Sequence, residues 1–545
     1  MDFYKMTKEE LIEYIKNLNE NDNGKYGLIW DKEKEPEQIV VDCDKYIPVL
    51  NEVKDKDINN GGQENVLIEG DNFHSLSVLN YTHKESIDVI YIDPPYNTGN
   101  KDFIYNDRFV DVEDGYRHSK WLNFMQKRLK LARNLLKEDG IIMISIDDNE
   151  FAQLKLLCNS IFSENNFVCN YVWQKNFAPK NDNKYISTSH EYILMYAKNK
   201  DLYNRNLVPR SEKNNSSYSN PDNDSRGVWT SGTCLATSFS KSGVFEVIAP
   251  NGKKHLPPKG KCWRYSPEKF QELIKENRIW FGKNGNGVPR VKRFLSDMPN
   301  GIVPQTWLKY EDVGSAQDGS KDLKEIFKST VFNFPKPVKL IKFLIDRHVN
   351  KDAIVLDFFA GTGTTGHAVL DLNKEDGGNR KFILCTNNEN DICEKITYQR
   401  IKNVINGYGD KSGLGGTLKY FKTEFVDNIG TRDQLYYDLT EKCIPMLCIK
   451  GNTFDKLVSN NEYTIFTNHN KTKYTCVYFD IFGLKYDDFI NKIKDLKEEK
   501  LIYIFTLGDY VNTSNLKDVN NYTIEPIPYK IVELYKKIVK MSKEG

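Results

Sequence analysis

Two stretches decide the fold of this chain: residues 87–96 read IDVIYIDPPY, and residues 354–366 read IVLDFFAGTGTTG. Each begins as a short, nearly continuous apolar run, which is typical of a strand buried on both faces of a parallel sheet. Each then ends in residues that break a strand, prolines in the first and glycines in the second. The two stretches therefore predict two strands of one α/β sheet, each with a polar turn at its carboxyl end.

Similar runs occur on both sides of these stretches. Residues 65–69, 141–146 and 381–385 are also apolar, and helical spacing separates the runs, most clearly over residues 121–135. Strands that alternate with helices predict a parallel sheet covered by helices on both faces. We therefore expect an α/β fold of the Rossmann-like type.

The pattern also suggests domain boundaries. Residues 1–60 read as an N-terminal helical segment, and the α/β texture occupies residues 61–170 and 331–424. Residues 171–330 lack it and are rich in Asn, Gly, Ser, Lys and aromatics, so we expect them to be inserted into the sheet domain. Residues 425–545 alternate short strand-like runs with helices and predict a separate C-terminal α/β appendage.

Composition excludes several classes of protein. The chain is 39% hydrophobic and 28% charged, a composition that can bury a core. Its 545 residues are too many for a single domain. No run approaches the 18 or more apolar residues of a membrane helix, and the N-terminus lacks the apolar core of a signal peptide. Ten cysteines without a CxxC pair indicate reduced thiols rather than disulfides or a metal site. We expect a cytoplasmic protein without a metal.

Charge is unevenly distributed. The whole chain carries a net charge of +1, yet residues 171–330 contain 26 Lys and Arg against 16 Asp and Glu. Such an excess occurs by chance on a solvated face, but it also suits a module that contacts a polyanion.

The glycine-rich turn predicts a ligand site. Gly361, Gly363 and Gly366 fit G-x-G-x-x-G, which lets the backbone approach a ligand at the N-terminus of a helix. An acidic residue after the next strand would bind ribose hydroxyls; Glu389 lies suitably, with Asp391 as its rival. By itself the motif does not distinguish NAD, FAD and S-adenosylmethionine, or these from a structural turn.

The turn of residues 93–96 predicts a second site. Pro94 and Pro95 have no N–H, so their carbonyls and the Asp93 carboxylate offer acceptors only. Such a turn suits an amino group with two N–H bonds to donate, and Tyr96 adds a flat ring for stacking on a base. Taken alone, a rigid surface turn would be the better interpretation.

Together the two motifs resemble the amino-group DNA methyltransferases that use S-adenosylmethionine. Their order, with DPPY before FAGTGTTG, resembles the circularly permuted β-group, and the ensemble is similar to the modification (Mod) subunits of type III restriction–modification systems. The resemblance covers about residues 60–200 and 330–410. Its flanking parts are GDN at 70–72, NTG at 97–99, ISIDDNE at 144–150, VWQK at 172–175, SHEY at 189–192 and FPKP at 334–337.

The resemblance implies a reaction and a set of residues. N6 of an adenine flipped out of double-stranded DNA would attack the donor methyl group while Asp93 and the Pro94 carbonyl accept its N–H bonds and Tyr96 stacks on the base. Asp71, Asp357 and Phe359 would lie around the cofactor, although Asp71 also suits a helix N-cap. The strand before Asp71 would then neighbour the strands that end at Asp93 and Asp357.

The inserted segment would recognise the target sequence. Its interleaved aromatic and basic residues could contact bases and phosphates. We assign DNA contacts to Trp263, Arg264, Arg290, Lys292 and Arg293. Lys336 and Lys339 could frame the cofactor pocket, but surface exposure is the default for lysine.

Other functions compete with adenine methylation. N4-cytosine methylation needs the same donor, although an Asp at position 93 favours adenine in the resembled family. A catalytically idle DNA-recognition subunit and a nucleotide-dependent dehydrogenase are alternatives from other classes. The chain has no GxxxxGK[ST] motif, so ATPase and nuclease activity would belong to a separate restriction subunit, which residues 425–545 could bind. The resemblance also implies a homodimer.

Overall fold

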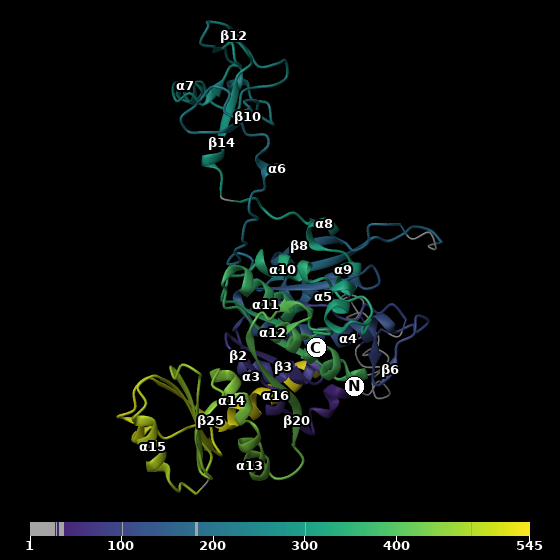
Figure 1. The fold of residues 1–545 in the computed structure, drawn as a ribbon, viewed down its shortest axis with the longest axis vertical. Coiled ribbons are helices and arrows are strands. Elements are labelled where there is room, and N and C mark those ends of the chain that lie inside the picture. Colours follow the sequence, from purple (N-terminus) through teal and green to yellow (C-terminus); the bar gives the residue numbers. More distant parts are fainter. Residues whose placement is uncertain are drawn as a thin grey trace, which may run out of the picture. The chain divides into compact units, whose positions relative to one another are not determined.

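The computed structural model describes residues 28, 30–31, 37–100, 102–179, 184–299, 301–480 and 482–544. They form two compact units: unit 1 holds the described residues up to Arg205 and from Thr306 on, and unit 2 is Asn206–Gln305 (Figure 1). The helix predicted at the start of the chain lies outside the described residues. No helix of the described part is long and apolar enough to cross a membrane.

Unit 1 is built on a large mixed sheet. Its strands β20, β3, β17, β16, β4 and β7 run parallel, whereas β1 and β9 are antiparallel to their neighbours. This confirms the predicted Rossmann-like α/β fold. From one edge the order is β1 (Tyr46–Glu52), β20 (Gly416–Asp427), β3 (Glu64–Glu69), β17 (Lys381–Thr386), β16 (Ile354–Asp357), β4 (Ile87–Ile92), β7 (Leu136–Ile146), β9 (His190–Ala197), β8 (Phe167–Gln174) and β15 (Trp307–Leu308), and β2 (Ile58–Asn60) also pairs with β20.

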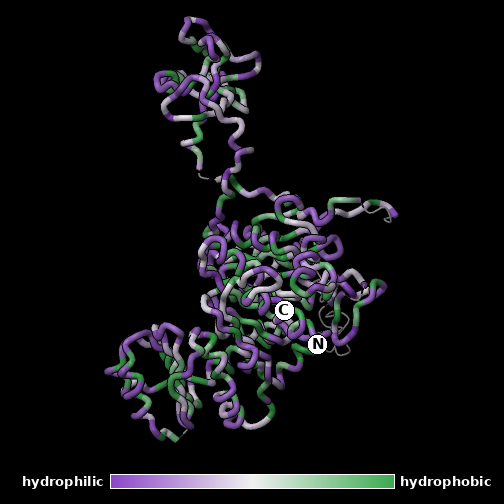
Figure 2. The backbone as a smooth tube through the Cα atoms, viewed as in Figure 1, coloured by the Kyte–Doolittle hydropathy of each residue, from purple (hydrophilic) through white to green (hydrophobic). Residues whose placement is uncertain are grey.

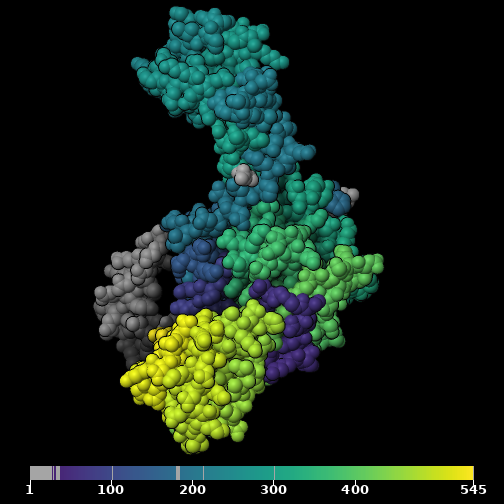
Figure 3. Space-filling model, turned by 60° about the vertical axis from the view of Figure 1, so that its left-hand side comes forward, coloured from purple at the N-terminus to yellow at the C-terminus, as the bar shows by residue number. Residues whose placement is uncertain are grey.

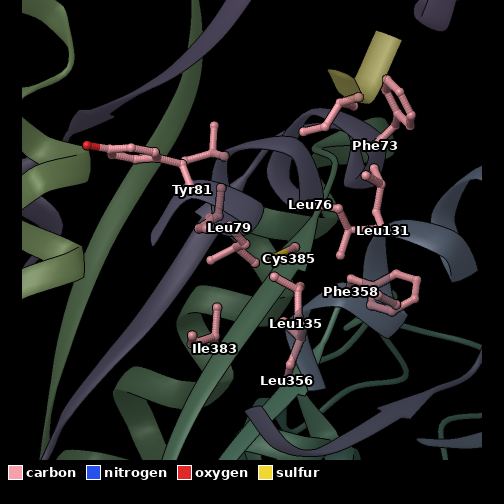
Figure 4. Packing of buried hydrophobic residues seen from close by; sticks show 14 of the residues in the cluster. Phe73, Leu76, Leu79, Tyr81, Leu131, Leu135, Leu356, Phe358, Ile383 and Cys385 are labelled. Atoms are coloured by element: carbon pink, nitrogen blue, oxygen red, sulfur yellow. The ribbon is translucent and has the colours of Figure 1, made fainter. Parts of the chain in front are cut away.

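Helices cover both faces of this sheet. On one face lie α3 (Asn72–Thr82), α4 (Arg117–Leu135) and α5 (Phe151–Phe162), and on the other α10 (Val338–Asp346), α11 (Thr364–Asp376) and α12 (Tyr398–Asn406). Along β17 successive side chains enter opposite cores: Ile383 and Cys385 pack with the α3–α4 helices, and Phe382 and Leu384 with α11. Figure 4 shows the first of these cores, and Figure 2 shows hydrophobic segments, in green, alternating with hydrophilic ones, in purple, along the backbone.

The strand order corrects one expectation. The sequence predicts the strand before Asp71 beside those that end at Asp93 and Asp357, but β16 and β4 pair directly with each other. β3, which ends before Asp71, instead lies between β17 and β20. The order of strands in the chain does not determine their order in the sheet, so the position of β3 could not be read from its own residues.

The inserted unit is narrower than residues 171–330. β8 and β9 pair with each other, and β9 pairs with β7, so they belong to the large sheet; α9 (Ala316–Phe327) also lies in unit 1. Unit 2 has a small antiparallel sheet of β10 (Trp229–Thr233), β14 (Arg290–Phe294) and β13 (Ile279–Trp280), with α7 (Pro267–Lys275). Its own apolar cluster includes Trp263 and Phe270.

The C-terminal residues are part of unit 1 rather than a separate unit. They contain α13 (Arg432–Lys442), α14 (Ile444–Gly451), α15 (Tyr486–Lys494) and α16 (Tyr529–Glu544), with a second sheet of β21 (Asp455–Ser459), β22 (Tyr463–Thr467), β23 (Lys473–Tyr478), β24 (Glu499–Thr506) and β25 (Tyr522–Pro528). α14 and α16 pack on α3, and the Tyr535 hydroxyl donates to the Pro48 carbonyl at 2.7 Å. Figure 3 shows this part, in yellow, beside the first strands in purple.

Candidate active site

The two polar turns that follow β4 and β16 meet at one edge of the large sheet. Because these strands are parallel neighbours, their carboxyl ends lie at the same edge, where ligands of open α/β sheets bind. A cavity of about 930 Å³ lies there. Both turns line it, together with the ends of other elements; its wall includes Asp71, Asp93, Pro94, Pro95, Phe124, Phe359, Gly361 and Glu389. The structure thus brings most of the predicted site residues of unit 1 into one cavity.

The two glycines of the loop differ in what they face. Gly361 lines the cavity, and a Cβ there would have only the Phe359 carbonyl oxygen within 4 Å, at 3.8 Å. Gly363 precedes α11, and a Cβ would lie 3.2 Å from the Thr397 methyl group. Both have positive φ, +50° and +75°, which L side chains rarely adopt. Gly361 is therefore the glycine that leaves room for a ligand, whereas Gly363 makes room for neighbouring protein.

Asp357 stabilises this loop through hydrogen bonds inside the protein. Its carboxylate accepts hydrogen bonds from the Phe359 N–H at 3.0 Å and the Thr365 hydroxyl at 2.5 Å, and it does not line the cavity. Burial raises the pKa of Asp357 to about 7, against the effect of these two hydrogen bonds. The Phe359 ring, by contrast, lines the cavity and lies 5.9 Å from the Phe124 ring.

Asp71 is both a helix cap and a cavity residue. It caps α3 by accepting from the Phe73 N–H at 2.7 Å, and it also lines the cavity. Fully buried Arg128 lies behind it, with Nη2 3.5 Å from Asp71 Oδ1 and 2.8 Å from Glu37 Oε1. The two interpretations of Asp71 are therefore compatible, because the cap and the arginine hold the carboxylate at the wall.

Of the two acidic rivals after β17, Glu389 lines the cavity. Asp391, two residues later, forms an ion pair with Lys395 at 2.8 Å and is not part of the cavity wall. The backbone reverses here, with Asn390 and Asp391 both at positive φ.

The turn of residues 93–96 is held by buried partners. The Lys336 ammonium donates to both oxygens of Asp93 at 2.8 Å and to the Tyr96 hydroxyl at 3.0 Å. Tyr96 in turn donates to Asp93 Oδ1 at 2.8 Å, and it is not among the residues that line the cavity. Trp121 donates its indole N–H to the Pro95 carbonyl at 2.8 Å. The Asp93 carboxylate is therefore a hydrogen-bond acceptor fixed at the cavity wall.

Sequence reasoning placed Lys336 only at the frame of the cofactor pocket, with surface exposure as the default, and it missed Glu191 as a site residue. Lys336 is only 9% exposed, in contrast to Lys339 on the surface. Glu191 on β9 accepts from Lys175 at 2.8 Å and from Tyr96 at 3.2 Å. Burial opposes its ionisation, but the ammoniums of Lys336 and Lys175 hold the pKa of Glu191 below its ordinary value. Both residues lie in the SHEY and FPKP stretches that support the resemblance, which was the available signal.

The structure corrects two of the DNA contacts assigned in unit 2. Trp263 is 3% exposed and donates its indole N–H to the Phe245 carbonyl, so it belongs to the core. Lys292 is 1% exposed and forms ion pairs with Asp222 and Asp224. Neither side chain is available to a ligand at the surface, because each is used to hold the small unit together. Arg264, Arg290 and Arg293 are exposed.

Comparison with known proteins places these motifs in a family. A family model described as DNA methylase matches residues 87–398. The chain is 37% identical over 375 residues to the type III restriction–modification enzyme StyLTI Mod subunit of Salmonella typhimurium, a match of 63% of this chain and 56% of that protein. It is 31% identical to the EcoPI Mod subunit of Escherichia phage P1, over 70% of this chain and 67% of that protein.

A type II enzyme is also similar. Methyltransferase M.KpnI of Klebsiella pneumoniae is 34% identical, over 66% of this chain and 90% of that protein. The chain thus spans little more than half the length of the StyLTI relative and most of M.KpnI.

Proposed function

Since the chain belongs to the DNA methylase family, we propose that it transfers a methyl group from S-adenosylmethionine to N6 of a flipped-out adenine in double-stranded DNA. The observation that carries this proposal is the shared cavity. It joins an acceptor-only Asp-Pro-Pro turn, which suits an amino group, to a glycine loop that a ligand can approach. In this proposal the methyl donor and the amino group meet between β4 and β16.

The cavity fits the proposed donor in size and chemistry. Its volume of about 930 Å³ is within the range of small-molecule sites, which extends to about 1,000 Å³. Carboxylates at Asp71 and Glu389 suit amino and hydroxyl groups, and the Phe359 and Phe124 rings suit flat apolar parts. S-adenosylmethionine would supply an electrophilic methyl group, so the protein needs no covalent nucleophile.

The role of the protein is then positioning and electrostatics. Asp93 would accept an N–H of the adenine amino group, which favours a nitrogen whose lone pair points out of the ring plane. Flipping a base out of the duplex costs a few kcal/mol. In this structure the Tyr96 hydroxyl is bonded to Asp93, so we assign Tyr96 to orienting the acceptor as well as to stacking.

Unit 2 is the proposed target-recognition module. Residues 206–305 contain 16 Lys and Arg against eight Asp and Glu, and Arg264, Arg290 and Arg293 are exposed. Such a surface supports salt-dependent phosphate contacts and readout of base edges by arginine. This supports DNA recognition by unit 2, and the intact Asp93, Tyr96, Gly361 and Gly363 favour an enzyme over an idle recognition subunit.

We further propose that the chain is the modification subunit of a type III system. Two of the similar proteins are named Mod subunits of such enzymes. A separate restriction subunit with ATPase and nuclease activity would be its partner, and residues 425–545 would contribute to the docking surface. The homodimer stays a prediction, which sedimentation velocity of the purified chain tests.

The decisive experiment is transfer of labelled methyl from S-adenosylmethionine to unmethylated genomic DNA, followed by nucleoside analysis. We expect N6-methyladenine. Detection of N4-methylcytosine would leave the proposed site unchanged and would show that the methylated base is cytosine rather than adenine. No transfer despite cofactor binding would contradict the proposed activity and favour an idle recognition subunit.

A further inference from the structure

The Lys336 ammonium is hydrogen-bonded to Asp93, the carboxylate that the proposed function assigns to the target amino group. Its ammonium bonds to both oxygens of Asp93 at 2.8 Å and is 9% exposed. Burial opposes the charged form, but Asp93 and Glu191 raise the pKa of Lys336 above its ordinary value, so it is a cation. A neutral amino group that binds Asp93 must therefore share this carboxylate with a buried cation or displace the cation from it.

Glu191 offers that cation a second partner. Its Oε2 already forms an ion pair with the Lys336 ammonium at 3.5 Å, which is longer than a charge-assisted hydrogen bond of about 2.8 Å. A shift of the ammonium by about 0.7 Å would bring it within that hydrogen-bond distance. The other carboxylate oxygen of Glu191 is held by Lys175 at 2.8 Å, so Glu191 stays in place while the lysine moves.

We propose that Lys336 is a positioning residue that competes with the target amino group for Asp93 and moves onto Glu191 when the amino group binds. The inference rests on the proposed function, which supplies the amino group. The movement keeps the ammonium paired, because Lys336 exchanges the half-buried Asp93 carboxylate for the more deeply buried Glu191 carboxylate. Leaving a buried ammonium without a partner would be strongly unfavourable, so Glu191 is what allows the base to bind Asp93.

The same ammonium helps to hold the pKa of Glu191 below its ordinary value. Asp93 and Glu191 are two nearby carboxylates, and Lys336 lies between them. Without this ammonium Glu191 would take up a proton at a higher pH than in the wild type, because burial raises its pKa and Lys336 is the main charge that opposes this. The other titratable groups around this pair come from the neighbouring strands and turns: Tyr91, Tyr96, Asp147, Lys175 and Asp357.

The first variant is Glu191→Gln, which removes the second partner and keeps the shape. Lys336 should then stay on Asp93 and compete more strongly with the base. We expect KM for DNA to rise about tenfold, the usual scale for a lost hydrogen bond to a charged group, while kcat changes little. Fluorescence of 2-aminopurine placed at the mapped target position should fall in parallel, because fewer bases are flipped.

The second variant is Lys336→Met, whose effect should depend on pH. We expect the acid limb of the kcat–pH profile to move up by about one unit. Lys336→Arg, which keeps the charge, should leave the limb near its original position. The double variant Lys336→Met with Glu191→Gln should also return it, because the Glu191 carboxyl group that takes up the proton is then absent. Lys339→Met removes an exposed lysine three residues away and is the matched control.

These outcomes separate the inference from the proposed function. If the wild type transfers no methyl group to any DNA, the proposed function fails and the competition fails with it. If the wild type is active but Glu191→Gln changes neither KM nor 2-aminopurine fluorescence, only the inference fails. A loss in Lys336→Met that is equal at every pH, or that the double variant does not relieve, would show a merely structural lysine and also overturn it.

Discussion

At the scale of single residues, the site depends on which atoms are used by the protein and which face the cavity. Asp93 faces the cavity, and its carboxylate accepts hydrogen bonds from Lys336 and Tyr96. Asp357, one strand away, is turned inward and braces the loop. Two aspartates at the ends of neighbouring strands thus have different tasks because of their surroundings.

The substitution Asp93→Ala tests the acceptor role. It removes the carboxylate that would accept the amino N–H and leaves the glycine loop untouched. We expect methyl transfer to fall at least about 100-fold, the scale of losing one preorganised hydrogen-bonding group. Affinity for S-adenosylmethionine, measured by calorimetry, should stay within a few-fold. An active variant would refute the role of Asp93.

The two loop glycines should respond differently to valine. Gly361→Val would place its side chain in the cavity, so we expect S-adenosylmethionine affinity to fall at least about tenfold. Gly361→Val and Gly363→Val would each also carry backbone strain of about 1–3 kcal/mol, because both positions have positive φ. Gly363→Val adds a clash with Thr397 and should lower the melting temperature further. Calorimetry and thermal denaturation of both variants check this. Equal binding losses with equal melting temperatures would contradict the distinction.

At the scale of elements, strand β14 shows that neighbouring residues serve opposite purposes. Arg290 and Arg293 are exposed, whereas Lys292 is buried against Asp222 and Asp224. A basic run in the sequence therefore contains both surface charges and a structural ion pair. Burial, which depends on how β14 packs, decides which is which.

The double variant Arg290→Ala with Arg293→Ala should weaken DNA binding without unfolding unit 2. Each lost phosphate contact lowers the slope of log Kd against log salt by about 0.9, so we expect a slope change of about 2. Lys292→Met should instead lower the melting temperature, because it leaves two carboxylates without their buried partner. Fluorescence anisotropy over a salt series, with thermal denaturation, distinguishes them. An unchanged slope in the arginine variant would remove these two contacts.

The elements behind the 93–96 turn carry a pH-dependent contact. Glu150, at the start of α5, accepts hydrogen bonds from Asn97 Nδ2 at 2.5 Å, while its Oε1 also lies 2.7 Å from His118 Nδ1. Burial raises the pKa of Glu150 to about 8 and lowers that of His118. Near neutral pH this is therefore a neutral carboxyl beside a neutral imidazole rather than a salt bridge.

Stability should follow from this shift. The folded-state pKa of Glu150 lies above its unfolded value of about 4.5, so the folded state binds the proton more tightly. Its stabilising effect is complete below pH 4.5 and is lost as pH rises toward 8. Relative to Glu150→Gln, which cannot ionise, the wild type should lose roughly 2 kcal/mol between pH 6 and pH 9. Parallel melting curves of the two proteins against pH would contradict this.

At the scale of the whole molecule, the C-terminal residues complete the sheet domain. β20 pairs with β3 and β1 inside the large sheet, and α14 and α16 cover α3. The Tyr535 hydroxyl bonds to the Pro48 carbonyl almost 490 residues earlier in the chain, in buried surroundings. We therefore expect the stability of β1 and α3 to depend on α16.

Truncation after residue 424 should consequently impair folding of unit 1. It would cut β20 before its end at Asp427 and remove both helices from α3. We expect poor soluble yield or a lower melting temperature, measured on the truncated and full-length chains. A truncated chain that melts like the wild type would contradict this. Partner docking is better tested with substitutions of exposed residues, such as Phe482→Ser and Tyr510→Ser, which are 80% and 71% exposed.

Much of the fold and part of the site could be predicted from sequence. The strands around residues 87–92 and 354–357 have local signals, namely an apolar run followed by strand-breaking prolines or glycines. That these two strands pair with each other was not predicted. The position of β3 was not predictable, because strand order depends on contacts between distant segments. Burial of Trp263 and Lys292 was missed for the same reason: an aromatic or basic residue type does not reveal what packs against it.

The sequence by itself determined the chemistry of the two turns: prolines remove donors at residues 94 and 95, and glycines permit positive φ at residues 361 and 363. These properties are local, because they follow from the covalent structure of each residue. Only the tertiary structure decided that Lys336 reaches Asp93, 243 residues earlier, and that Glu191 lies within 3.5 Å of the same ammonium. Folding brings these charges together from distant parts of the chain, and no local sequence pattern specifies how far apart they will lie.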